Sequence, residues 1–311
     1  MAETAKYVYD AASAIIRGRR EYQEDALAVD FPAGAGLGFV VLADGMGGHS
    51  SGDVASMIVV TEVFSELKLR ANDAAQLESE IGLILHSAVT CANDCVGRMA
   101  DDRPQMRGMG ATLVAPIVID NRLYWISVGD SPLYMFRGNR LFRLNEEHSV
   151  ESRMKRLVDR GEMAREAAEA HPDRGCLTSV LIGGDIPEID CRDTPIELRH
   201  NDILIAASDG LQFLSDQEIA LIVHDARALP SAEISARLIK RITDLNDPEQ
   251  DNVSLCVLKV QENQRLDRPA DVSHAPTPVA EVDTTRMAML SRMNGTTRIW
   301  TRNCFQGRDR Q

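Results

Sequence analysis

Four aspartates each stand at one end of an apolar run, and this arrangement could gather carboxylates at one place in a fold. They are Asp44 after run 37–43, Asp130 after 123–129, Asp209 after 203–208 and Asp251 before 252–260. If the runs are buried strands, the carboxylates would repel each other and resist losing water. Such a cluster persists only with protons, basic partners or cations.

The oxygen donors of this cluster favour Mg²⁺ or Mn²⁺. No histidine or cysteine stands beside the four aspartates in ligand-like spacing, which argues against zinc. A site for two cations needs a shared carboxylate, such as Asp44. Taken alone, Asp44-Gly45 after an apolar run is more often a hairpin turn. The recurrence of the pattern at three further positions favours the cluster.

A polar loop over 17–25 adds a cation and two more acids, because Arg20 lies four and five residues before Glu24 and Asp25. Arginine binds phosphate oxygens in pairs through its planar fork. Arg20 beside a metal site would therefore indicate a phosphorylated substrate. Without the downstream aspartates, the loop is more typical of a solvated charge run.

The elements that must position these residues are short strands and amphipathic helices. Helices are expected over 50–67, 74–99, 150–160, 163–170, 215–223 and 231–245, and strands over 8–31 (as a pair), 37–43, 111–119, 122–129, 132–136, 140–143, 188–191, 202–208 and 252–260. The strands over 111–143 follow each other too closely for parallel crossovers. The pattern predicts an α+β fold with an antiparallel sheet core faced by helices.

A helical insert interrupts the strand pattern over 148–184, between two of the candidate ligands. A lid or a specificity element would lie at such a place. A packing subdomain without a role in substrate choice remains an alternative.

The composition is that of a soluble globular chain of 311 residues, with 44% hydrophobic and 26% charged residues. The net charge of −13 disfavours nucleic acid as a partner. Six scattered cysteines, no secretory segment and no run of 18 apolar residues predict a reduced cytoplasmic protein without a membrane span. Residues 262–311 are expected to be a flexible linker and a basic tail, with six arginines against one acid over 284–311.

Six motifs in order resemble the metal-dependent serine/threonine protein phosphatases of type 2C (PPM), and most closely their bacterial branch. The motifs are Arg20-x-x-x-Glu24-Asp25, Asp44-Gly-Met-Gly-Gly48, Gly108-Met-Gly-Ala-Thr112, Gly129-Asp-Ser131, Ser208-Asp-Gly210 and Asp251-Asn252. The resemblance covers about residues 8–261, with an insert at about 146–184. It implies a central antiparallel β-sandwich flanked by helices on both faces, in four layers (α-β-β-α).

The resemblance also implies a role for each matched residue. Asp44 would bridge two Mn²⁺ or Mg²⁺ ions, the Gly45 carbonyl would complete one site, and Asp209 and Asp251 would bind the other ion. Asp130, with Asp209, would serve a third, weaker site. Arg20 would hold the substrate phosphate, and Glu24 and Asp25 would act through metal-bound water.

The implied reaction is hydrolysis of phosphoserine and phosphothreonine on proteins by a water or hydroxide between the two metals, without a phosphoenzyme. The implied partners are phosphoproteins made by a bacterial Ser/Thr kinase, and the enzyme is expected to act as a cytoplasmic monomer. Arg20 and Asp44 are the predicted catalytic residues.

The chain departs from the family pattern at two positions. Met46 stands where eukaryotic members have a histidine proposed as general acid, and His49 nearby is a candidate for capping or packing. Pro132 stands where the family often has arginine, which removes a charge and an N–H donor beside Asp130. Two rival functions remain: a phosphoprotein-binding regulator without turnover, and a hard-cation module for which Arg20 has no use.

Overall fold

The fold is described from a computed structural model, for residues 6–32, 34–47, 51–263, 292–293 and 296–297. The chain divides into a compact unit over Met1–Asp267 and a second unit over Arg268–Gln311. In the second unit the described residues form one antiparallel pair, β12 (Arg292–Met293) with β13 (Thr296–Thr297). The rest of the expected linker and basic tail lies outside the described residues.

Two antiparallel sheets form the centre of the first unit. One sheet has the order β1 (Tyr7–Ile16), β11 (Val253–Glu262), β10 (Ile203–Ala207), β7 (Leu133–Arg137), β8 (Arg140–Arg143). The other has the order β2 (Asp25–Asp30), β3 (Leu37–Met46), β5 (Leu113–Ile119), β6 (Arg122–Val128), β9 (Asp190–Glu197), and β4 (Gly110–Ala111) pairs with β3. Every strand pairing within these sheets is antiparallel, as the sequence predicted.

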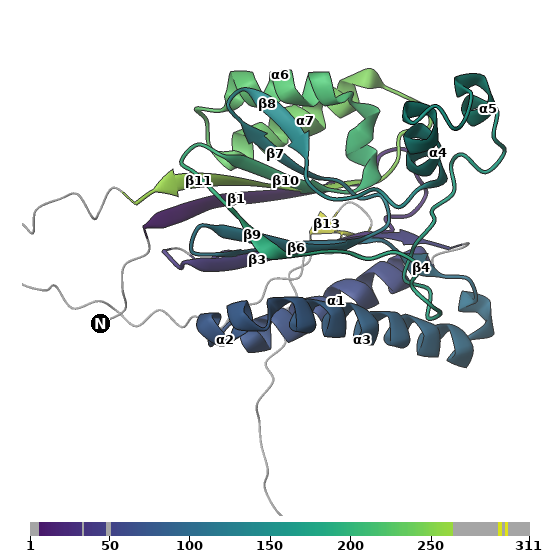
Figure 1. The fold of residues 1–311 in the computed structure, drawn as a ribbon, viewed down its shortest axis with the longest axis horizontal. Coiled ribbons are helices and arrows are strands. Elements are labelled where there is room, and N and C mark those ends of the chain that lie inside the picture. The colour runs from purple at the N-terminus through teal and green to yellow at the C-terminus, as the bar shows by residue number, and fades with distance from the viewer. Residues whose placement is uncertain (1–5, 33, 48–50, 264–291, 294–295, 298–311) are drawn as a thin grey trace, which may run out of the picture. The chain divides into compact units, whose positions relative to one another are not determined.

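Helices cover the outer face of each sheet (Figure 1). The sheet containing β3 carries α1 (Gly52–Arg70), α2 (Ala74–Ser79) and α3 (Ile81–Asp102); the sheet containing β11 carries α6 (Asp216–Ala226) and α7 (Ser231–Leu245). Two further helices, α4 (Val150–Asp159) and α5 (Arg165–Glu169), lie in the insert. Short 3₁₀ turns occupy Pro104–Met106 and Asp209–Phe213. This is the four-layer sandwich that the family resemblance implied.

The strand β3 contributes side chains to two apolar layers, one on each of its faces. Its even positions Val40 and Leu42 pack between the two sheets, whereas Phe39 and Val41 pack against the helices. Successive side chains of a strand point to opposite faces, so a strand between two layers must be apolar at every position. The unbroken run before Asp44 follows from this burial on both faces.

The prediction of a single helix over 74–99 is wrong, because the structure has two helices there. Glu80 ends α2 and precedes α3 with φ −114° and ψ 14°, outside helical geometry. Asp73 caps α2 by accepting a hydrogen bond from the Gln76 N–H. Leu77 on α2 and Ile81 on α3 both lie in the core. They are four residues apart and would share one face of an uninterrupted helix, so their spacing gives no sign of the break. Apolar periodicity therefore cannot locate this boundary.

Candidate active site

The layer between the sheets changes from apolar to polar at one end, and the candidate residues lie there. Along β3, Val40, Leu42 and Asp44 share one face, so Asp44 points toward the opposite sheet. Asp25 stands directly across from Asp44 in the β2–β3 ladder. The same alternation on β2 places Leu27 beside this layer and Asp25 at its end. Two carboxylates of one sheet therefore face the interior together.

The opposite sheet contributes Asp209 and Asp251. Asp209 follows β10, Asp251 stands two residues before β11, and these strands are antiparallel neighbours. The end of one and the start of the other therefore lie at the same edge. Gly210 allows the approach, because a Cβ there would lie 1.9 Å from the Asn252 carbonyl oxygen. Asp44, Asp209 and Asp251 therefore lie near one another, although they are far apart in sequence. Asp130, described next, is the fourth aspartate of this group.

Thr112 links the backbone of Asp44 to Ser131, the residue that follows Asp130. The Thr112 Oγ1 accepts the Asp44 N–H at 3.1 Å, and the Thr112 N–H donates to the Asp44 carbonyl at 2.8 Å. The Thr112 hydroxyl also lies 2.8 Å from that of Ser131. Gly129, at φ +100°, makes the turn that fits against Thr112. Thr112 therefore fixes the turn of Asp130 relative to Asp44.

Burial and mutual repulsion dominate the electrostatics of these carboxyls. Burial, opposed by hydrogen bonds from serine and reinforced by the charges of Asp209 and Asp251, raises the pKa of Asp25 to about 7. Burial and the charge of Asp209 raise the pKa of Asp130 to about 7. The pKa of Asp44 is raised well above its usual range by burial and by the neighbouring carboxylates. The pKa values of Asp209 and Glu24 are raised as well, chiefly by burial.

The carboxylates have the donor chemistry for hard divalent cations. Oδ1 of Asp25 and Oδ1 of Asp209 are buried without a hydrogen-bond partner within the described part of the chain. Buried carboxylate oxygens of this kind gain most from a cation. In the same part of the chain, no three histidine, cysteine or acidic side chains already converge on one ion position. The carboxylates line the site, and their chemistry fits Mg²⁺ or Mn²⁺.

The loop between β1 and β2 brings Arg20 to this cluster. Its Nη2 lies 2.6 Å from Oδ2 of Asp251, and 58% of the Arg20 side chain is exposed. The loop backbone is held by Asn252, whose amide donates to the carbonyls of Arg17 and Tyr22 and accepts the Glu24 N–H at 2.7 Å. A cation-rich loop thus opens to solvent above the carboxylates.

Asn252, Thr112 and Ser208 belong to the six motifs, but the sequence predicted no role for them. Ser208 donates from its hydroxyl to Oδ2 of Asp25 at 2.8 Å and accepts the Ser254 N–H at 3.0 Å. Each of these side chains joins two segments that are far apart in sequence. The available signal was a short polar residue next to a candidate ligand, at the end of an apolar strand.

The two departures from the family pattern lie within the site. Met46 is the last residue of β3 and pairs with Gly110. Its thioether side chain has no acidic proton to offer. Pro132 is buried, and its carbonyl accepts the Ala207 N–H. The proposed substitute His49 lies outside the described residues.

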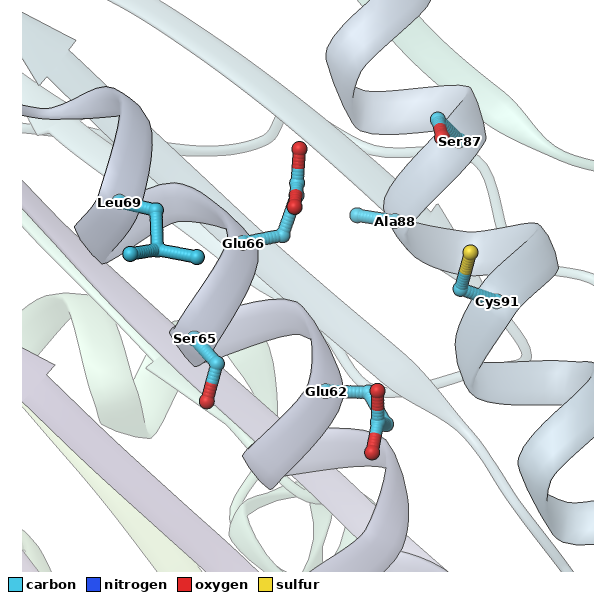
Figure 2. Close-up of a pocket in the computed structure, with 7 residues that line it drawn as sticks. All are labelled: Glu62, Ser65, Glu66, Leu69, Ser87, Ala88 and Cys91. Atoms are coloured by element: carbon cyan, nitrogen blue, oxygen red, sulfur yellow. The ribbon is translucent and has the colours of Figure 1, made fainter.

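Two hollows lie outside the carboxylate cluster. One, of about 210 Å³, separates α1 from α3 and is lined by Glu62, Ser65, Glu66, Leu69, Ser87, Ala88 and Cys91 (Figure 2). The other, of about 300 Å³, is lined by Ile16, Gly18, Arg19, Thr243 and Gln250. The second hollow adjoins the loop that carries Arg20. Neither hollow is lined by a carboxylate of the candidate active site.

Relatives of this chain are bacterial phosphatases. It is 32% identical to the serine/threonine protein phosphatase PstP of Mycobacterium tuberculosis over 73% of this chain and 41% of that protein. It is 28% identical to the protein phosphatase PhpP of Streptococcus pneumoniae over 73% of this chain and 88% of that protein. A crystal structure of the PstP catalytic domain in complex with two manganese ions aligns with a TM-score of 0.63 and 30% identity, over 82% of this chain and 100% of that one.

The four-layer sandwich with carboxylates at one end of its interior defines the class, that of the PPM-type serine/threonine phosphatases. The chain belongs to the protein phosphatase 2C family, whose pattern matches residues 16–255. The resemblance inferred from the six motifs is therefore confirmed, as is the fold. The match spans less than half the length of PstP. None of the described helices is long and apolar enough to cross a bilayer.

Proposed function

We propose that this chain hydrolyses phosphoserine and phosphothreonine on proteins, with two Mn²⁺ or Mg²⁺ ions and without a phosphoenzyme. The observation that supports this most is the meeting of Asp25 and Asp44 from one sheet with Asp209 and Asp251 from the other, beside an exposed Arg20. Neighbouring carboxylates from both sheets have the donor chemistry for cations, and the arginine beside them has the donor chemistry for an anion. A substrate with a phosphate fits both.

The proposed ligands are Asp44 as the bridge, the Gly45 carbonyl, Asp209 and Asp251, with Asp130 at a third, weaker site. When bound, two such cations lower the pKa of water and offset charge on the transferring phosphoryl group. Gly45 has no room for a side chain, since a Cβ would lie 2.0 Å from the Gly52 carbonyl oxygen and 2.6 Å from that of Glu24.

Arg20 is the residue proposed to bind the substrate phosphate. Its partner in the structure, Asp251, is a proposed ligand whose charge a cation would share, and this releases the guanidinium for phosphate oxygens. Asn252 keeps the loop backbone in place during that exchange. Glu24 and Asp25 are proposed to orient water around the cations, and Asp25 is itself oriented by Ser208.

The proposed partners are phosphorylated proteins, the products of a Ser/Thr kinase, met in the cytoplasm by a monomer. The names of PstP and PhpP, both protein phosphatases, support the substrate class. We propose residues 8–261 as the catalytic domain and the insert at about 146–184 as the element that selects substrates. Residues 262–311 are proposed as linker and tail.

The test is hydrolysis of a phosphothreonine peptide with Mn²⁺, with Mg²⁺ and with chelator. Asp209→Asn keeps the shape of the side chain and removes its charge, so we expect turnover to fall at least about 100-fold. Asp225→Asn, at an exposed position of α6, is the matched control and should leave turnover unchanged. A wild type that binds Mn²⁺ but hydrolyses none of several phosphopeptides would favour the binding regulator. Binding of Mn²⁺ that phosphopeptides do not affect would favour the cation module.

A further inference from the structure

Arg143 joins the turn of Asp130 to the base of the helical insert. It is the last residue of β8, and its side chain is 19% exposed. Its Nη2 donates to the Asp130 carbonyl at 2.6 Å, and its Nη1 lies 2.5 Å from Oε2 of Glu147. One guanidinium therefore holds a candidate metal ligand with one nitrogen and the insert with another.

The link continues from Glu147 into the first helix of the insert. Oε1 of Glu147 accepts the Ser149 hydroxyl at 2.5 Å, and Oγ of Ser149 accepts the Ser152 N–H at 3.0 Å as the N-cap of α4. A charge-assisted chain of this kind is stronger than its neutral equivalent and fixes the direction of each group. The start of α4 is therefore oriented by the same arginine that orients Asp130.

A second contact at the same place keeps the insert and the turn in register. The Gly129 N–H donates to Nδ1 of His148 at 3.1 Å, and the His148 N–H donates to the Gly129 carbonyl at 2.9 Å. Burial lowers the pKa of His148, consistent with a neutral ring that accepts at Nδ1. These bonds hold the backbone, but they reach Gly129 and leave the Asp130 carbonyl to Arg143.

The neighbouring residue in the turn cannot do what Arg143 does. Pro132 has neither a charge nor an N–H, and the Ser131 hydroxyl is directed to Thr112. Among the hydrogen bonds of the described residues, the Asp130 carbonyl receives the one from Arg143. We propose that Arg143 is a positioning residue that couples the order of the insert to the weakest metal site, the one that includes Asp130.

The proposal rests on the proposed function, since it takes Asp130 to be a metal ligand. Partners that orient a ligand typically change metal affinity by about 10- to 100-fold when they are lost. Loss of Arg143 should therefore weaken one Mn²⁺ site by about 10-fold or more and leave the two tighter sites unchanged. It should also speed hydrogen exchange in α4, because the cap of that helix loses its anchor.

The experiment compares wild type with Arg143→Ala, Arg143→Lys and Glu147→Gln, by Mn²⁺ titration calorimetry and by hydrogen exchange of the metal-free protein. Arg140→Ala, an exposed arginine of the same strand, is the matched control. Arg143→Ala is expected to show both effects and Glu147→Gln faster exchange in α4. Arg143→Lys has one ammonium group in place of the planar guanidinium, so it should recover only part of the Mn²⁺ affinity that Arg143→Ala loses. Arg140→Ala should match wild type.

Three results would overturn the coupling. They are a wild type with only two Mn²⁺ sites, an Arg143→Ala variant whose weakest site stays within twofold of wild type, and unchanged exchange in α4. Failure of the proposed function would be seen separately, as a wild type without turnover. The exchange of the metal-free protein still tests the contact between Arg143 and the insert in that case.

Discussion

Asp25 and Asp44 stand directly opposite each other in the β2–β3 ladder, with their side chains on the face toward the second sheet. Like charges at such a position destabilise a sheet. The structure keeps them there with Ser208 bonded to Asp25 and Thr112 bonded to the backbone of Asp44. A pair that weakens the fold and is still held in place indicates a site built for a ligand of opposite charge.

The metal-free protein should lose stability as the pH rises from about 4 to 7. Asp25 and Asp130, with pKa values raised from 3.8 to about 7, hold protons in the folded chain that the unfolded chain has released. Stability falls with pH wherever the folded state binds more protons. Thermal melts in chelator should show this fall, and saturating Mn²⁺ should reduce it.

Replacing Asp25 and Asp130 by asparagine tests how much these two carboxyls contribute to the pH dependence of stability. Asp25→Asn with Asp130→Asn should flatten the dependence of the melting temperature on pH, whereas exposed Asp225→Asn should not. Equal slopes for the double variant and wild type would contradict the assignment.

Arg20→Ala should lower kcat/KM for a small aryl phosphate by about 100-fold, the usual scale for removing one preorganised donor to a transferring oxyanion. Arg20→Lys should recover only part, since an ammonium cannot bind two phosphate oxygens as a planar fork does. Arg19→Ala is the neighbouring control, because its guanidinium bonds to Asn246. A normal rate in Arg20→Ala would remove the phosphate-binding role.

Gly45→Ala should destabilise the metal-free fold by about 2 kcal/mol or more, since the added methyl would meet the backbone oxygens of Gly52 and Glu24. Gly175→Ala meets nothing within 4 Å and should be neutral. Urea unfolding of both variants in chelator gives the difference directly. Equal midpoints would mean that the β3 end relaxes more freely than its packing indicates.

Exchanging residues 150–184 for the corresponding segment of PhpP keeps Glu147, His148 and Ser149 in place. It should change the ranking of phosphopeptide substrates while a small aryl phosphate is hydrolysed as before. The insert is tied at its base by the Ser149–Leu177 bridge, which gives the exchange fixed ends. An unchanged peptide ranking would assign the insert to packing alone.

The apolar runs predicted the strands well because burial on both faces leaves a continuous signal, as at β3. The same logic located Asp44, Asp209 and Asp251, since a carboxylate directly beside such a run stands out. Glu80 gave no comparable signal, because Leu77 and Ile81 on its two sides keep helical spacing across the break. Asn252 and Arg143 were missed as supports because their partners lie 228 and 13 residues away, set by strand register rather than by spacing.

The first strand of the sandwich pairs with the last, from Tyr7 opposite Glu262 to Ile16 opposite Val253. Arg20 follows β1, and Asp251 and Asn252 precede β11, so the cluster is complete only after nearly the whole domain has been synthesised. A nascent chain that ends before Asp251 holds Asp44 and Arg20 but lacks the residues that complete the site. The order of strands thus delays completion of the carboxylate cluster until translation of the domain is nearly finished.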